Sequence, residues 1–74
     1  MIWDYNKVFE NEAVIKYNFK WEDDESVSGI IAYDKKSKEI IIENNNKMSF
    51  QWVKTNFQFV IDEGFPDKRT VMIG

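Results

Sequence analysis

The segment from Met48 to Asp62 constrains the fold of this 74-residue chain more than any other. Eight of its fifteen residues are apolar, and four of these are aromatic. At about 100° per residue, as in an α-helix, one apolar stripe would face a core. This stripe consists of Phe50, Val53, Phe57, Val60 and Ile61. The other apolar residues of the segment fall on the opposite side: Met48, Trp52 and Phe59. A helix with two apolar sides needs a second neighbour in addition to its sheet.

Two kinds of secondary structure fit this segment. Its apolar residues also alternate on either side of residues 54–56, as two short strands would require. The residues that follow favour a helix, because Gly64 suits the left-handed position after a helix C-terminus and Pro66 cannot continue a helix. Phe65 between them can pack back on the last turn. We therefore predict one long helix over about residues 47–63.

Alternation of apolar and polar residues predicts a strand from Ala13 to Trp21. The odd positions carry its apolar side, and the even positions carry Lys16, Asn18 and Lys20. The acidic run at residues 22–25 follows and predicts a charged turn.

A second hairpin is expected from Val27–Tyr33 and Ile40–Ile42, which are rich in β-forming residues. Asp34 begins the polar run between them and can accept hydrogen bonds from the backbone of a turn. Gly29, in the middle of the first strand, indicates a bulge or the close approach of an aromatic ring. The asparagines at residues 44–46 are expected to end the second strand and to cap the helix.

The two ends of the sequence are also expected to join the sheet. Ile2, Trp3 and Tyr5 predict an edge strand, after which Val8 and Phe9 would pack where the chain turns. Residues 70–73 predict a short strand that returns to the sheet.

Together these segments predict the α+β class. The expected architecture is a small two-layer domain, in which an antiparallel sheet of three to five strands carries the long helix on one face. The length fits a single domain over residues 1–74. Six Phe, three Tyr and three Trp must supply most of its core, because the chain has no Cys and no His for disulfides or the usual zinc ligands.

The absence of His and Cys from the sequence excludes most catalytic chemistry. Without His or Cys, the chain cannot form a Ser-His-Asp or Cys-His arrangement or use a histidine as general base. The acidic run at residues 22–25 lacks the spaced ligands and the turn glycine of an EF-hand loop. We therefore expect a protein that is not an enzyme and that binds no cofactor and no metal.

Charge and hydropathy narrow the range of partners. Ten basic and thirteen acidic residues give a net charge of −3, which argues against binding dominated by nucleic-acid phosphates. No stretch is apolar enough to predict a membrane span, and the first residues lack the order of a signal peptide, so we expect a cytoplasmic protein. The excess of Lys over Arg, with many Ile and Asn, fits an AT-rich genome such as that of a bacterium or its phage.

Met48, Trp52 and Phe59 give the best indication of function. We expect them to form a protein interface, because Trp and Met are enriched at interfaces. The chain would then be a non-catalytic protein–protein interaction module: a homodimer, or a small regulatory, inhibitory or immunity-type protein. Two explanations compete with an interface. The segment could form two strands, or the N-terminal residues could cover its second side: Ile2, Trp3, Val8 and Phe9.

The alternative function is single-stranded nucleic-acid binding by exposed aromatic rings together with Lys35, Lys36 and Lys38. One expected feature argues against it. Lys16 and Lys20 should point away from the aromatic residues of their own strand, so that basic and stacking groups would lie on opposite faces.

Overall fold

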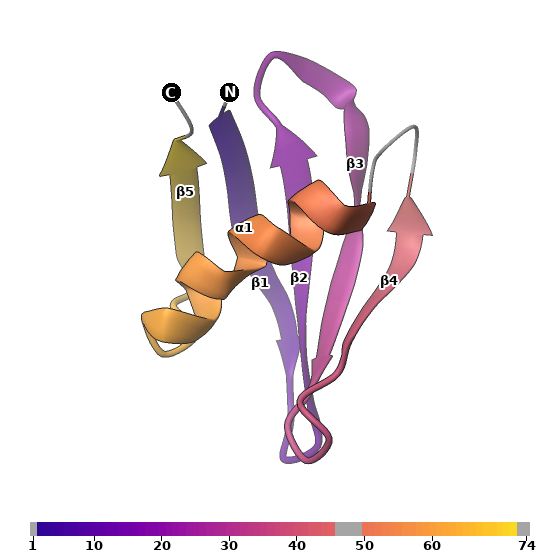
Figure 1. Ribbon diagram of the computed structural model, residues 1–74, viewed down its shortest axis with the longest axis vertical. Coiled ribbons are helices and arrows are strands. Elements are labelled where there is room, and N and C mark those ends of the chain that lie inside the picture. The colour runs from indigo at the N-terminus through magenta and orange to yellow at the C-terminus, as the bar shows by residue number, and fades with distance from the viewer. Residues whose placement is uncertain (1, 46–49, 73–74) are drawn as a thin grey trace.

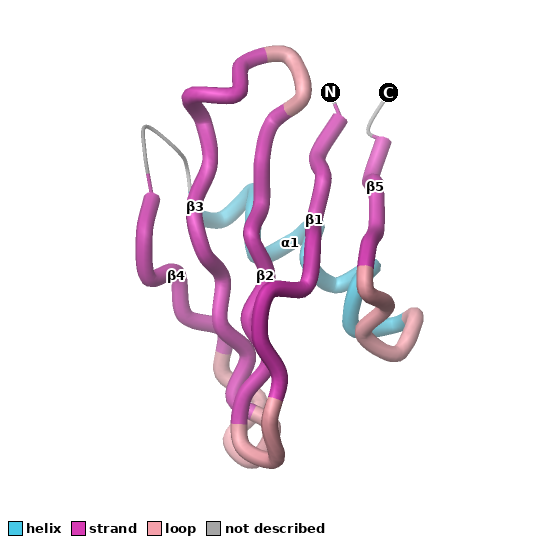
Figure 2. The backbone as a smooth tube through the Cα atoms, turned by 180° about the vertical axis from the view of Figure 1, so that it is seen from behind, coloured by secondary structure: helices cyan, strands magenta, loops and turns pink. Residues whose placement is uncertain are grey.

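The computed structural model describes residues 2–45 and 50–72, with side chains described at all of these except 24–27, 44–45 and 50–52. Five strands and one helix follow one another along the chain: β1 (Ile2–Glu10), β2 (Val14–Trp21), β3 (Asp24–Asp34), β4 (Ile40–Asn45), α1 (Phe50–Asp62) and β5 (Lys68–Met72). The strands form one antiparallel sheet in the order β4-β3-β2-β1-β5. The helix crosses one face of this sheet (Figure 1). Seen from behind, no described element covers the other face (Figure 2).

This architecture confirms the predicted α+β class, with one helix on an antiparallel sheet. The helix occupies residues 50–62 of the predicted 47–63, and the prediction for residues 47–49 lies outside the described residues. The alternative of two short strands is wrong, because α1 is continuous through residues 54–56.

The helix ends as the residues after it predict. Gly64 has a φ of 77°, and its N–H donates to the carbonyl of Ile61 at 3.1 Å. The N–H of Phe65 donates to the carbonyl of Val60 at 3.0 Å, which completes a Schellman motif. The Phe65 ring then packs on Tyr33, with ring centroids 5.0 Å apart. This connection turns the chain from α1 toward β5.

Aromatic residues build the core between α1 and the sheet. Phe57 is fully buried and packs against three tyrosine rings at centroid distances of 5.4 to 6.5 Å, those of Tyr5, Tyr17 and Tyr33. The Tyr5 hydroxyl donates to the carbonyl of Val53 in the helix at 3.1 Å. Burial raises the pKa of the Tyr5 hydroxyl far above its ordinary value, and raises that of Tyr17 to about 12.

Strand β2 follows the predicted alternation. Ile15, Tyr17 and Phe19 are buried on the helix side, and the even positions lie on the other side. Trp21 is half-buried at the end of the strand, where it stacks on Trp3 of β1 with centroids 5.9 Å apart. The predicted strand began at residue 13, whereas β2 begins one residue later.

One of the two turns in the β2–β3–β4 meander is shorter than predicted, and the other forms as predicted. The predicted acidic turn at residues 22–25 is shorter, because Trp21 already pairs with Asp24. The turn after β3 forms as expected: the Asp34 carboxylate accepts the backbone N–H groups of Lys36 at 2.8 Å and Ser37 at 3.0 Å. These bonds from Ser37 and Lys36 lower the pKa of Asp34.

Gly29 lies directly opposite Phe19 of β2, and the ladder between β3 and β4 shifts register just after Ile30. This position, opposite an aromatic residue and next to an irregular pair, agrees with the prediction of a bulge or a nearby aromatic ring at Gly29. The prediction for the asparagines is wrong in part, because residues 44 and 45 continue β4 instead of ending it. The third, at residue 46, lies outside the described residues.

The N-terminal strand differs most from its prediction. β1 is not an edge strand, because it pairs with β2 on one side and with β5 on the other; the edges are β4 and β5. Val8 and Phe9 do not pack at a turn either, since both are exposed within β1. The pairing passes from Lys7 opposite Tyr17 to Phe9 opposite Lys16, so Val8 is the extra residue of a β-bulge. The bulge reverses the alternation and turns Phe9 to the side of Lys16.

Candidate interaction surface on the helix

The three residues predicted to form an interface differ in what the structure describes of them. Met48 lies outside the described residues, and Trp52 belongs to α1 with its side chain not described. Phe59 has 47% of its surface exposed, on the side of α1 away from the sheet. It lies seven residues after Trp52, so the two backbone positions share one side of the helix. Phe59 is therefore the predicted interface residue that the structure shows to be exposed.

The inward side of α1 agrees with the predicted stripe. Val53, Phe57 and Val60 are fully buried and Ile61 is partly buried. Asn56 is buried with them, which the apolar pattern did not indicate. Of the helix residues with described side chains, the exposed ones are Lys54, Thr55, Gln58, Phe59 and Asp62, and the helix itself lies in front of the sheet in Figure 1.

The outward side of α1 carries a shallow, open hollow of about 420 Å³. Its lining consists of Lys54, Thr55, Gln58, Phe59 and Asp62. Within it, the Gln58 amide donates to the Asp62 carboxylate at 2.8 Å, which holds both side chains along the helix. The hollow is too open to enclose a small molecule, but it suits side chains from another protein surface.

Arg69 of β5 flanks this hollow. Its guanidinium lies 5.8 Å from the centroid of the Phe59 ring, within the range of a cation–π contact. The same guanidinium forms an ion pair with Glu63 just after the helix. Phe59 is therefore held beside a cation that already has its own counter-ion. Sequence periodicity could not have identified Arg69, because it comes from a different element.

Two charged side chains on the outward side of α1 have no ion-pair partner among the described residues. The Lys54 side chain makes no hydrogen bond or ion pair with any residue that the structure describes. The Asp62 carboxylate accepts the bond from Gln58 but makes no ion pair with any described side chain. A carboxylate in the last turn of a helix also opposes the helix dipole, at a cost of about 0.3–1 kcal/mol when exposed. The spacing of Lys54 and Asp62 was visible in the sequence, but their lack of partners was not.

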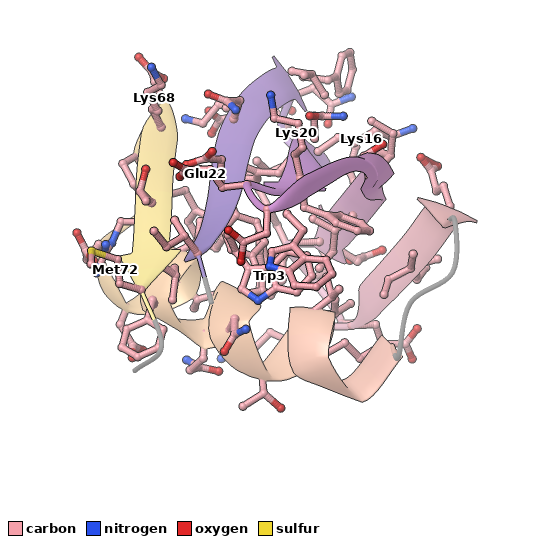
Figure 3. All side chains as sticks on the ribbon, turned by 90° about the horizontal axis from the view of Figure 1, so that it is seen from above. Trp3, Lys16, Lys20, Glu22, Lys68 and Met72 are labelled. Atoms are coloured by element: carbon pink, nitrogen blue, oxygen red, sulfur yellow. The ribbon has the colours of Figure 1, made fainter. Side chains whose placement is uncertain are left out.

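The open face of the sheet is a second surface to consider. Lys16, Lys20 and Lys68 point to the side away from the helix (Figure 3). A row of paired residues crosses this face through Phe9, Lys16, Ala32 and Ile41. Phe9 and Ile41 are exposed at its two ends, and the Lys16 ammonium pairs with Glu43 at 3.0 Å. Apolar and charged groups are thus mixed on this face, as on an ordinary solvated sheet face.

The three lysines predicted to bind single-stranded nucleic acid do not form one cluster of unpaired charges. They are Lys35, Lys36 and Lys38. Lys35 pairs with Glu10 at 3.1 Å, and Lys7 contacts the same carboxylate at 2.9 Å. These hydrogen bonds, first from Lys7 and then from Lys35, lower the pKa of Glu10. Lys36 and Lys38 remain exposed at the tip of the hairpin.

Other kinds of site are not found in the described part of the chain. Its acidic residues form no group of three or more that could hold a metal ion. Its helix does not have the length and apolar character that spanning a bilayer requires. The chain matches no protein-family model, no curated protein and no solved structure.

Proposed function

We propose that this protein is a non-catalytic interaction module that binds a protein partner through the outward side of α1. The observation that carries this proposal is the exposure of Phe59 beside an open hollow. An exposed aromatic ring at the edge of a hollow is the kind of residue that dominates binding energy at interfaces. Arg69, stacked near the same ring, belongs to another residue type enriched there.

The structure gives little support to the competing explanation that the N-terminal residues cover the outward side of α1. Val8 and Phe9 do not cover α1, because both are exposed and Phe9 is turned to the opposite face of the sheet. Trp3 is buried beneath the inward side of α1, with the rest of the core. Phe59 itself stays 47% exposed, with the Arg69 guanidinium over its ring at 5.8 Å from the centroid.

Site-specific photo-crosslinking tests this function. A photoreactive phenylalanine analogue at position 59 should yield a covalent protein adduct in cells that produce the protein. The same analogue at Lys36, exposed on the distant hairpin, is the matched control and should yield little adduct. Equal crosslinking from both positions, or none from position 59, would contradict the proposal.

Single-stranded nucleic-acid binding is the second candidate, and one observation favours it. The β-bulge places the exposed Phe9 ring on the same face as Lys16, so a stacking group and a cation do share a surface. Against it, Lys16 and Lys35 are each already paired with a carboxylate. Fluorescence anisotropy with a labelled oligonucleotide at low salt distinguishes the two functions. We expect no binding, whereas affinity that falls steeply with salt and with Lys36→Glu would favour nucleic acid.

A further inference from the structure

We propose that the partner of α1 is a second copy of this chain. In this homodimer the two helices run antiparallel about a two-fold axis near Gln58, and Lys54 of each copy pairs with Asp62 of the other. The inference rests on the proposed function, because it uses the same outward side of α1, and it goes further by naming the occupant and its orientation.

Charge complementarity carries the proposal. Lys54 lies four residues before Gln58 and Asp62 lies four residues after it, on the outward side of the helix. A two-fold axis at Gln58 therefore brings each Lys54 opposite the Asp62 of the other copy. One helix separates the two charges by about 12 Å, at 1.5 Å per residue, so both ion pairs form at once. Neither charge has an ion-pair partner among the described residues of its own chain.

The same charges select the antiparallel orientation. Parallel helices in register would place Lys54 against Lys54 and Asp62 against Asp62, which repel each other. Antiparallel packing replaces both repulsions by attractions, and it sets a cation near the carboxylate that opposes the helix dipole. The surface is thus complementary to itself in one orientation and not in the other.

Phe59 lies close enough to this two-fold axis to form an apolar contact between the two copies. It lies one residue beyond Gln58, so the two Phe59 rings of the pair meet on the same flank, offset by about 3 Å along the helix. Each ring keeps the guanidinium of its own Arg69 over it. The hollow beside Phe59 receives side chains of the opposite helix.

The size of the surface indicates a weak dimer. The outward side of the 13-residue helix is a strip about 20 Å long and about 10 Å wide. A standard interface buries about 800 Å² on each partner, and this strip supplies less. At about 200 Å² the strip is roughly a quarter of that area, so we expect a dissociation constant well above the micromolar range and a dimer that forms only at high protein concentration.

Sedimentation velocity over a range of concentrations tests the pairing by charge exchange. Lys54→Glu and Asp62→Lys should each weaken the dimer about tenfold, because two attractions become two repulsions. The double variant should restore it. An equimolar mixture of the two single variants should also dimerise, because every pair in the mixed dimer then joins opposite charges. Lys36→Glu, which changes the charge by the same amount as Lys54→Glu, is the control and should have no effect.

Several results would overturn this inference. It fails if the protein is monomeric at all concentrations, or if neither the double variant nor the mixture restores association while circular dichroism shows folded chains. The crosslinking experiment separates this failure from that of the proposed function. An adduct from position 59 with a different protein retains the interaction module and rejects the second copy, whereas an adduct twice the mass of the chain supports both.

Discussion

Gly64 offers the sharpest test of the helix stop, because its role can be separated into two parts. Its φ of 77° is a conformation that L residues avoid, whereas a Cβ added there would meet nothing within 4 Å. The cost of Gly64→Ala is therefore conformational and not steric. An L residue in the left-handed region costs about 1–2 kcal/mol. The smaller freedom of Ala in the unfolded chain returns about 0.4–1 kcal/mol. We expect a net loss of about 1 kcal/mol.

The mirror-image residue provides the matched control. D-Ala at position 64 adds the same methyl group but prefers a positive φ, so it should stabilise the fold by about 0.4–1 kcal/mol. In a domain of this size, 1 kcal/mol shifts the melting temperature by about 4–8 °C. Both variants can be made by chemical synthesis and compared with the wild type by thermal unfolding, followed by circular dichroism.

The sign of the D-Ala effect decides between explanations. If D-Ala destabilises the protein as much as L-Ala does, the added methyl group meets an atom and the steric part of the argument is wrong. If L-Ala has no effect, the chain does not need the left-handed conformation at this position. Either result would refute the account of how α1 ends.

Three further predictions concern the core, the pH dependence and the bulge. Phe57→Ala should cost about 3–5 kcal/mol, a large part of the total stability of such a chain, and urea unfolding should show a greatly lowered midpoint. Burial raises the pKa of Tyr17 in the folded protein to about 12. The neutral hydroxyl therefore contributes fully to the free energy of unfolding below about pH 10, and this contribution is lost as the pH rises toward 12. Tyr17→Phe should therefore lessen the fall of the urea midpoint between pH 10 and 12, and an unchanged slope would contradict this. Deletion of Val8 should leave the fold intact, because the pairs of Lys7 and Phe9 on either side stay the same; loss of the native circular dichroism spectrum would show that the bulge is needed.

Local signals explain why much of the fold could be predicted. The alternation along β2 identified the buried Ile15, Tyr17 and Phe19 correctly, because side chains alternate strictly in a strand with one covered face. The Gly64 stop identified the helix where propensity and alternation disagreed. Both signals involve neighbouring residues, so no knowledge of the rest of the fold was needed.

The features that were missed depend on contacts distant in the sequence. β1 becomes an interior strand only because β5 pairs with its outer edge, and the Thr70 hydroxyl donates to Asp4 across that pair at 2.8 Å. Nothing near Ile2 or Trp3 indicates this neighbour. The bulge at Val8 was missed for a similar reason, since it is defined by the register against β2.

The candidate surface was predictable in part. Helical periodicity placed Phe59 outward, and the structure shows it exposed. Arg69 could not be assigned to the same surface, because its place beside Phe59 follows from the path of the chain through Gly64 into β5. The significance of Lys54 and Asp62 depends on their having no ion-pair partner in the folded chain, which only a structure can show.

The pairing of β1 with β5 has a consequence for how the chain folds. Strands β1 to β4 form three hairpins, each able to close through a short turn, but the β1–β5 pair joins Asp4 to residue 70, which is 66 positions away. Closing so long a loop is entropically costly until α1 has packed on the sheet and brought β5 near. We therefore expect the β1–β5 seam to form last and to open first. Native-state hydrogen exchange should show β5 amides exchanging through a partial opening, while those shared by β2 and β3 exchange only on global unfolding.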